Sequence, residues 1–153
     1  MTTIQSGLPF SVTDSTSGTI YGISTYAQFA PGKTPADAVR TGSIQDRLNG
    51  FFNTSAFVAP PTIGDGTGWG NSGRDILRGP GQKNFDIGIG RILQVGGLSE
   101  SGRMEFRSEF FNTFNHPQFA NPSANRGASS TFGVISSTVV APRIMQFALK
   151  YVF

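Results

Sequence analysis

Large apolar residues alternate with polar or small residues along three stretches of the chain, 85–95, 103–114 and 145–153. Successive side chains of a β-strand point to opposite faces of the sheet, so a period of two indicates strands whose faces meet different surroundings. The apolar residues expected to share one face are Phe85, Ile87, Ile89, Met104, Phe106, Phe110, Met145, Phe147 and Leu149. Arg91 interrupts the first stretch and Ser108 the second. The pattern favours an antiparallel sheet with one apolar and one polar face.

The composition agrees with strands joined by long loops. Charged residues form 14% of the chain, below the roughly 25% of an average soluble domain, while Phe occurs 14 times, Gly 20 times and Pro 9 times. A length of 153 residues suits one domain. We therefore predict an all-β fold of antiparallel up-and-down strands with long loops, in a single unit over residues 1–153.

The expected elements follow from where the alternation starts and stops. In chain order they are a strand pair in 8–30, loops with a short helical turn in 31–82, a hairpin in 83–115, a loop in 116–130 and a terminal hairpin in 131–153. Strands of about ten residues fit either a β-sandwich with one wet face or a barrel that crosses a bilayer around a polar lumen. The periodicity alone leaves both architectures open.

Residues suited to catalysis or metal binding do not cluster in the sequence. His116 is the single His, there is no Cys, and Asp65, Asp75 and Asp86 are too dispersed for a calcium-binding loop. The runs GDGTGWG and RGPG lack the Lys-Ser/Thr ending of a phosphate loop. We expect no enzyme activity, no cofactor and no metal. The twelve basic residues are scattered, so we also expect no nucleic-acid partner.

Several segments resemble a known family. The run FRSEFFNTFNHPQFANP, followed by FG and by PRIMQFALKYVF, is similar to the last two strands of TonB-dependent outer-membrane receptors, especially the Oar-like, carboxypeptidase-regulatory-domain-containing receptors of acidobacteria. TGSIQDRLNGFFNTSAFVAPP and NSGRDILRGPGQKNFDIGIG resemble the preceding loops and strand. The resemblance is dense over residues 40–153 and looser over 8–39. It implies an outer-membrane-barrel-like segment located in the bacterial outer membrane.

The resemblance also gives the end of the chain a role. Barrels of the bacterial outer membrane commonly end in a signal read by the barrel-assembly machinery, namely a polar residue, a small residue and two aromatic or apolar residues with Phe last. The residues in these places are Gln146, Ala148, Tyr151 and Phe153, with Ala148 standing where Gly is usual. The implied partners are therefore outer-membrane lipid and the assembly machinery.

Two functions stay open at this point. Receptors of this family resemble one another in having a plug, a TonB-contacting segment and a barrel of about twenty-two strands. This sequence offers about six strand candidates, so we expect no transport by these residues alone. The first hypothesis is the C-terminal barrel portion, or a truncated relative, of such a receptor. The second is a self-assembling structural β-protein, whose open strand edges pair with copies of itself in extracellular or cell-surface filaments or tubes.

Overall fold

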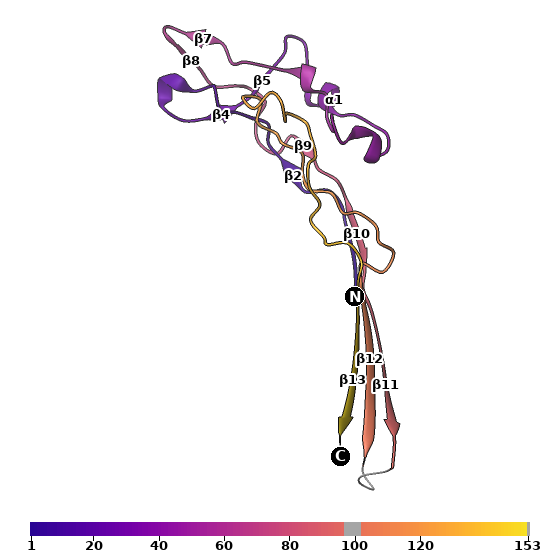
Figure 1. The fold of residues 1–153 in the computed structure, drawn as a ribbon. Helices are drawn as coiled ribbons and strands as arrows, with labels where there is room; N and C mark the ends of the chain where they lie inside the picture. Colours follow the sequence, from indigo (N-terminus) through magenta and orange to yellow (C-terminus); the bar gives the residue numbers. More distant parts are fainter. Residues whose placement is uncertain (97–101, 153) are drawn as a thin grey trace. The chain divides into compact units, whose positions relative to one another are not determined.

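The structure is a computed structural model that describes residues 1–96 and 102–152 (Figure 1). Its internal contacts divide the chain into two compact units. The strand unit contains residues 1–5, 82–118 and 138–153, and the loop unit contains residues 6–81 and 119–137. Both units lie within the single unit that was predicted over residues 1–153. The long connections between strands carry enough apolar residues to pack a core of their own.

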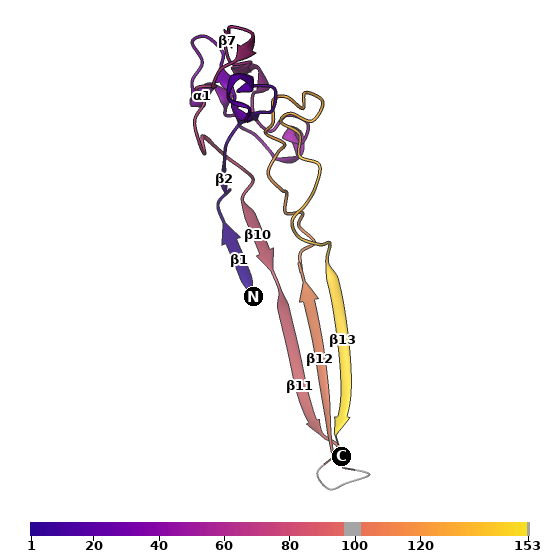
Figure 2. The ribbon, with the colours of Figure 1, turned by 90° about the vertical axis from the view of Figure 1, so that its left-hand side faces the viewer.

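The main sheet of the strand unit has three antiparallel strands in the order β11 (Ile87–Gln94), β12 (Arg103–Phe111) and β13 (Ile144–Val152). Figure 2 shows β12 between its two neighbours. β1 (Thr2–Gln5) pairs with β10 (Gln82–Phe85), which leads into β11. The main sheet is formed by the alternating stretches, and the predicted all-β, antiparallel fold is confirmed.

Side chains extend the sheet beyond the end of β12. The buried side-chain amide of Gln118 forms hydrogen bonds with both backbone groups of Lys83 in β10. Its Oε1 accepts from the N–H at 2.6 Å, and its Nε2 donates to the carbonyl at 2.7 Å. Asn112 has a positive φ of 49°, and its N–H donates to the Asp86 carboxylate at 2.9 Å. Its side-chain amide donates to the Ala141 carbonyl at 3.1 Å. The NTFNHPQ run therefore forms a hydrogen-bonded corner rather than a free loop.

The connections between strands are unequal in length. β11 and β12 are joined through residues 95–102, whereas residues 6–81 join β1 to β10 and residues 112–143 join β12 to β13. In the antiparallel register both long connections leave the strands at one end, and the short connection is at the other. Each long connection supplies part of the loop unit.

The loop unit consists of short strand pairs and single helical turns. Its strands are β2 (Pro9–Phe10), β3 (Thr13–Asp14), β4 (Thr25–Tyr26), β5 (Gln28–Phe29), β6 (Phe57–Val58), β7 (Thr62–Ile63), β8 (Gly66–Thr67) and β9 (Leu77–Arg78). Its helical turns are η1 (Thr19–Tyr21), α1 (Pro35–Ala38), η2 (Gln45–Arg47) and η3 (Thr54–Ala56). The pairs are β2 with β9, β3 with β4, β5 with β6 and β7 with β8.

An aromatic cluster forms the core of the loop unit. Phe52 is 2% exposed and its ring lies 5.9 Å from Phe10, 5.9 Å from Phe57 and 5.2 Å from Phe132 between centroids. Phe132 and the buried Ile135 belong to the second segment of the unit, so the core joins residues more than 80 positions apart in the chain. Part of the unusual Phe content is therefore used here, outside the main sheet.

Two expected elements differ from the structure. The strand pair in 8–30 is reduced to two paired residues on each side, because Asp14 accepts hydrogen bonds from the Thr16 backbone and hydroxyl, and such local bonds compete with a strand ladder. The terminal hairpin in 131–153 is not formed. Residues 131–140 contain no strand because Ile135 packs into the loop-unit core, and β13 pairs with β12.

Candidate functional site: the two faces of the main sheet

The register of the main sheet sorts its side chains into two unlike faces. On one face Ile87 and Met145 flank Phe110, Ile89 and Phe147 flank Ser108, Arg91 and Leu149 flank Phe106, and Leu93 and Tyr151 flank Met104. Only Arg91 and Ser108 are polar, and the Ser108 hydroxyl is within 3.4 Å of the Ile89 carbonyl oxygen. We call this the apolar face. It extends across all three strands and is interrupted by Arg91 and Ser108.

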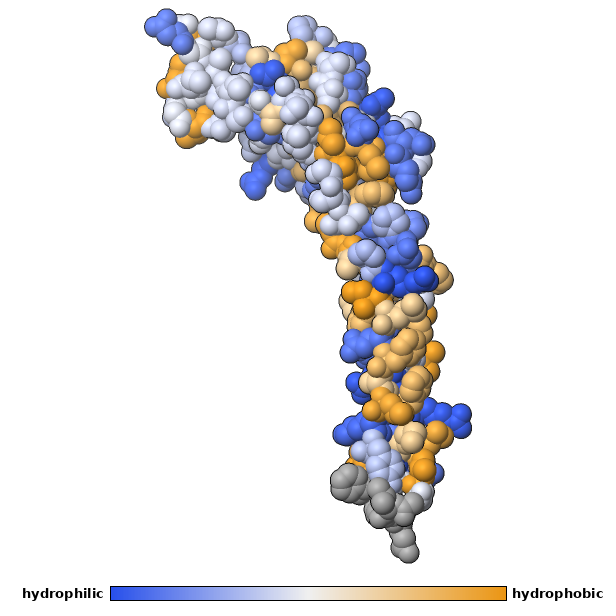
Figure 3. Space-filling view, viewed as in Figure 1, coloured by the Kyte–Doolittle hydropathy of each residue, from blue (hydrophilic) through white to orange (hydrophobic). Residues whose placement is uncertain are grey.

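The apolar face is open to its surroundings. Ile89 is 57% exposed, Phe147 is 62% exposed and Leu149 is 66% exposed. Figure 3 shows hydrophobic surface along the strand unit, with hydrophilic side chains at its margins. Each large apolar side chain left in water forgoes about 1.5–3 kcal/mol of burial free energy. A contiguous exposed patch of this kind marks an interaction surface.

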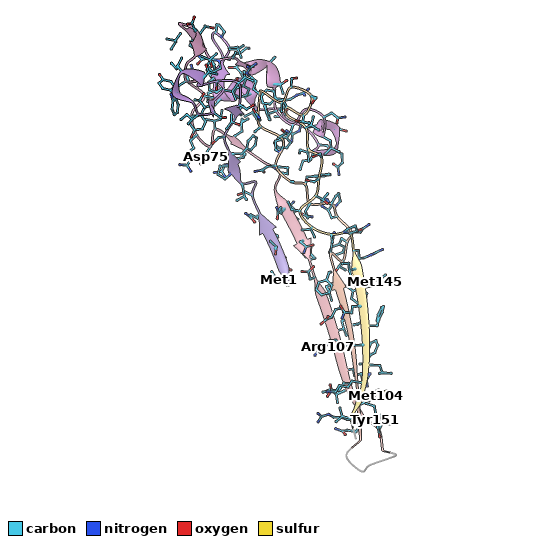
Figure 4. All side chains as sticks on the ribbon, turned by 60° about the vertical axis from the view of Figure 1, so that its left-hand side comes forward. Met1, Asp75, Met104, Arg107, Met145 and Tyr151 are labelled. Carbon is cyan, nitrogen blue, oxygen red and sulfur yellow. The ribbon has the colours of Figure 1, made fainter. Side chains whose placement is uncertain are left out.

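The opposite face carries mostly small, polar and charged side chains, with the apolar exceptions Ile92 and Val152 and the apolar pair Phe111 and Ile144 at its end. Across the strands it contains Gly88, Glu109 and Gln146; Gly90, Arg107 and Ala148; Ile92, Glu105 and Lys150; and Gln94, Arg103 and Val152. Figure 4 shows Arg107 on the other side of the strands from Met145 and Tyr151. Among the described residues the ion pairs of this polar face run along β12, Arg103–Glu105 at 3.2 Å and Arg107–Glu109 at 4.0 Å. The alternating charges of β12 thus pair with one another along that strand and not with side chains of the neighbouring strands.

The residues selected from the sequence fall on these faces. Eight of the nine lie in the main sheet and share its apolar face, while Phe85 lies in β10 and packs edge-on against Phe114 with centroids 5.3 Å apart. Of the proposed assembly signal, Gln146 and Ala148 lie on the polar face and Tyr151 on the apolar face. Phe153 lies outside the described residues. Recognition of this signal by the assembly machinery stays a prediction.

Within residues 1–96 and 102–152, no group of three or more His, Asp or Glu side chains is arranged to hold a metal ion. Over these residues, no helix has both the length and the apolarity needed to cross a membrane. His116 is exposed, and its backbone N–H donates to the Asn112 side-chain oxygen at 3.0 Å. Its position is thus explained by the corner that it helps to build.

A buried ion pair in the loop unit was not foreseen from the sequence. Asp14 is fully buried and its carboxylate binds Arg126, which lies 112 residues further along the chain. Burial raises the pKa of the Asp14 carboxyl, but hydrogen bonds from the Thr16 hydroxyl, from Arg126 and from the Thr16 N–H outweigh it. The pKa of Asp14 is consequently held below its ordinary value. The separation along the chain left no local pattern that would reveal the pair.

The strands, faces and connections together define a class of protein. Strands of eight or nine residues, one apolar and one polar face, and long connections confined to one end are features of a membrane β-barrel and favour it over a sandwich. The chain belongs to the family described as an outer membrane beta barrel domain, which matches residues 1–146. No curated protein and no solved structure matches the chain. The protein is thus a barrel-type protein of the outer membrane, as the resemblance implied at this coarser level.

Proposed function

We propose that this chain is the C-terminal barrel portion, or a truncated relative, of a TonB-dependent outer-membrane receptor, and that these residues do not transport by themselves. The proposal rests mainly on the pairing of β12 with β13 across the long connection in residues 112–143. The motifs that resemble such receptors, FRSEFFNTFNHPQFANP and PRIMQFALKYVF, occupy these two strands and the corner between them. In this role the apolar face meets lipid and the polar face meets the lumen.

A chimera tests the receptor proposal. A TonB-dependent receptor of the Oar-like group that lacks its last strands is expected not to assemble, since a barrel with an open edge is incomplete. Residues 83–153 of this protein, added in their place, should restore a protease-resistant receptor in the outer membrane. The same graft with Phe147→Asp and Leu149→Asp should fail. Equal failure of the unmodified graft, when the receptor's own terminal strands restore assembly, would contradict the proposal.

A second candidate function follows from the sheet edges. The outer edges of β11 and β13 have no strand partner in the part of the chain that the structure describes. Unpaired edges are templates for pairing with another chain, so copies of this protein are a candidate partner. Regular filaments or tubes in detergent-free buffer, seen by negative-stain electron microscopy, would favour this structural role. Amorphous material that becomes soluble and strand-rich only in detergent would favour the receptor role.

A further inference from the structure

A concave site in the loop unit combines an aromatic floor with three arginines. The cavity has a volume of about 510 Å³, and Phe51 and Leu77 are among its buried lining residues. Arg40, Arg47 and Arg78 also line it. Small-molecule sites typically have volumes of about 300–1,000 Å³, are mostly apolar and contain a few convergent polar groups. The size of this cavity falls within that range, and its lining combines apolar side chains with charged ones.

The three arginines are held by backbone carbonyls, not by carboxylates. Arg40 donates to the Gly50 carbonyl at 3.0 Å and Arg78 to the Gly7 carbonyl at 3.3 Å. Arg47 donates to the Phe51 carbonyl at 3.2 Å. None of the three takes part in an ion pair within residues 1–96 and 102–152. Carbonyls fix their positions and leave their full positive charge without a counter-ion.

Among the described residues, Asp75 is the one acidic residue that lines the cavity, and its carboxylate is engaged. Asp75 lies 3.7 Å from the Arg74 guanidinium and accepts a hydrogen bond from the Ser11 hydroxyl at 3.3 Å. Arg74 does not line the cavity. The lining therefore has three guanidinium groups against one carboxylate that is already paired. A net positive charge remains beside an apolar floor.

The guanidinium of Arg47 is also positioned by an aromatic ring. Its guanidinium carbon lies 4.8 Å from the centre of the Phe51 ring, a cation–π arrangement, while Phe51 is only 7% exposed. A guanidinium presents five N–H donors in a planar fork. Arg40 and Arg78 each form one of the carbonyl bonds, and Arg47 forms three, to Ser43, Arg40 and Phe51. The remaining donors suit the oxygen pair of a carboxylate or phosphate.

We propose that this cavity binds a small amphipathic anion, whose carboxylate or phosphate head is held by Arg40, Arg47 and Arg78 and whose apolar part lies on Phe51 and Leu77. This proposal goes beyond the proposed function, because it assigns a class of ligand to the loop unit and does not depend on the role of the main sheet. Charge complementarity selects the head group, and a cavity of about 510 Å³ has room for an apolar part of two fused rings.

The test is a binding titration on the full chain folded in lipid nanodiscs. Fluorine NMR would follow three probes: 6-fluoro-2-naphthoate, 6-fluoro-2-naphthyl phosphate and the neutral 6-fluoro-2-naphthalenemethanol. The two anions test the two head groups, and the neutral alcohol measures partition into lipid. At least one anion should bind at least tenfold more tightly than the alcohol. Equal affinity of the alcohol and both anions, or no binding at all, would overturn the proposal.

Substitutions test whether the arginines of the cavity, and not the overall positive charge of the chain, bind the anion. The double variant Arg40→Gln, Arg78→Gln should bind the anion at least tenfold more weakly, while Lys33→Gln, which removes an exposed charge of the loop unit outside the cavity, should bind as the unmodified chain does. Arg40→Lys with Arg78→Lys retains the charge and should restore part of the affinity. Unchanged fluorescence of Trp69 would show that the loop unit is folded in each case. Wild-type affinity in the glutamine double variant would refute the site.

Discussion

At the residue scale, the buried Asp14–Arg126 pair makes the stability of the loop unit depend on pH. Asp14 has a folded-state pKa below its unfolded value, so its contribution is fully present above the unfolded value of 3.8 and is lost as the pH falls through the folded value. Removing one partner of a buried pair leaves the other without its counter-charge, at a cost of about 3–5 kcal/mol. Since the Arg126 side chain is 26% exposed, we expect the lower end of that range.

Asp14→Asn should therefore destabilise the loop unit by about 3 kcal/mol at pH 7, and by progressively less as the pH falls below 3.8. Urea unfolding followed by the fluorescence of Trp69 measures this in the loop unit, because Trp69 is the single Trp of the chain. Asp65→Asn removes the same charge from an exposed position and serves as the control. A constant difference between the Asp14 variant and the parent from pH 7 to pH 2 would contradict the assignment.

In the strand unit, the side chain of Gln118 stabilises the backbone of β10. This side chain takes the place of a neighbouring strand beside Lys83, and it is 1% exposed. Gln118→Ala leaves the backbone N–H and carbonyl of Lys83 without these partners, which costs about 1–3 kcal/mol. Amide exchange of Lys83, measured by NMR, should accelerate about tenfold or more, whereas Gln5→Ala at an exposed site should change it little. Unaltered protection of Lys83 would show that other bonds hold this part of β10.

At the element scale, adjacent residues of β13 provide a matched comparison of the two faces. Leu149 lies on the apolar face and Ala148 on the polar face beside Arg107. A basic residue facing lipid at the bilayer midplane costs about 2–4 kcal/mol, and one facing a polar lumen costs far less. Leu149→Arg should therefore decrease the free energy of unfolding in phospholipid vesicles by about 2–4 kcal/mol more than Ala148→Glu does. The Ala148→Glu substitution places a charge beside Arg107. Similar losses in both variants would argue against lipid contact on one face.

The elements also show how far the sequence predicts the fold. Period-two alternation identified β11, β12 and β13 and the side chains of their common face, because the alternation reflects two different environments. The same rule predicted a strand in residues 131–140, where the apolar Phe132 and Ile135 instead serve a core formed mainly by residues 10–77. A local period does not reveal which distant segment receives an apolar side chain. The arginine-lined cavity escaped prediction for the same reason, since Arg40, Arg47 and Arg78 form no run in the sequence.

At the scale of the whole molecule, we propose that the apolar face of the main sheet contacts membrane lipid. The family match and the two unlike faces both support it. The chain has no Cys, so single cysteines can be introduced and spin-labelled without background. The most direct positions are consecutive residues 146–149 of β13, whose side chains alternate between the two faces.

The decisive measurement is the accessibility of these four labels to oxygen, which concentrates in lipid, and to a water-soluble nickel complex, by electron paramagnetic resonance in the membrane-embedded protein. Labels at Phe147 and Leu149 should be accessible to oxygen and protected from nickel, and labels at Gln146 and Ala148 should show the reverse. Such an alternation would establish a lipid-facing apolar face. Uniform access of nickel to all four labels, or an alternation of the opposite sign, would show that this face does not contact lipid.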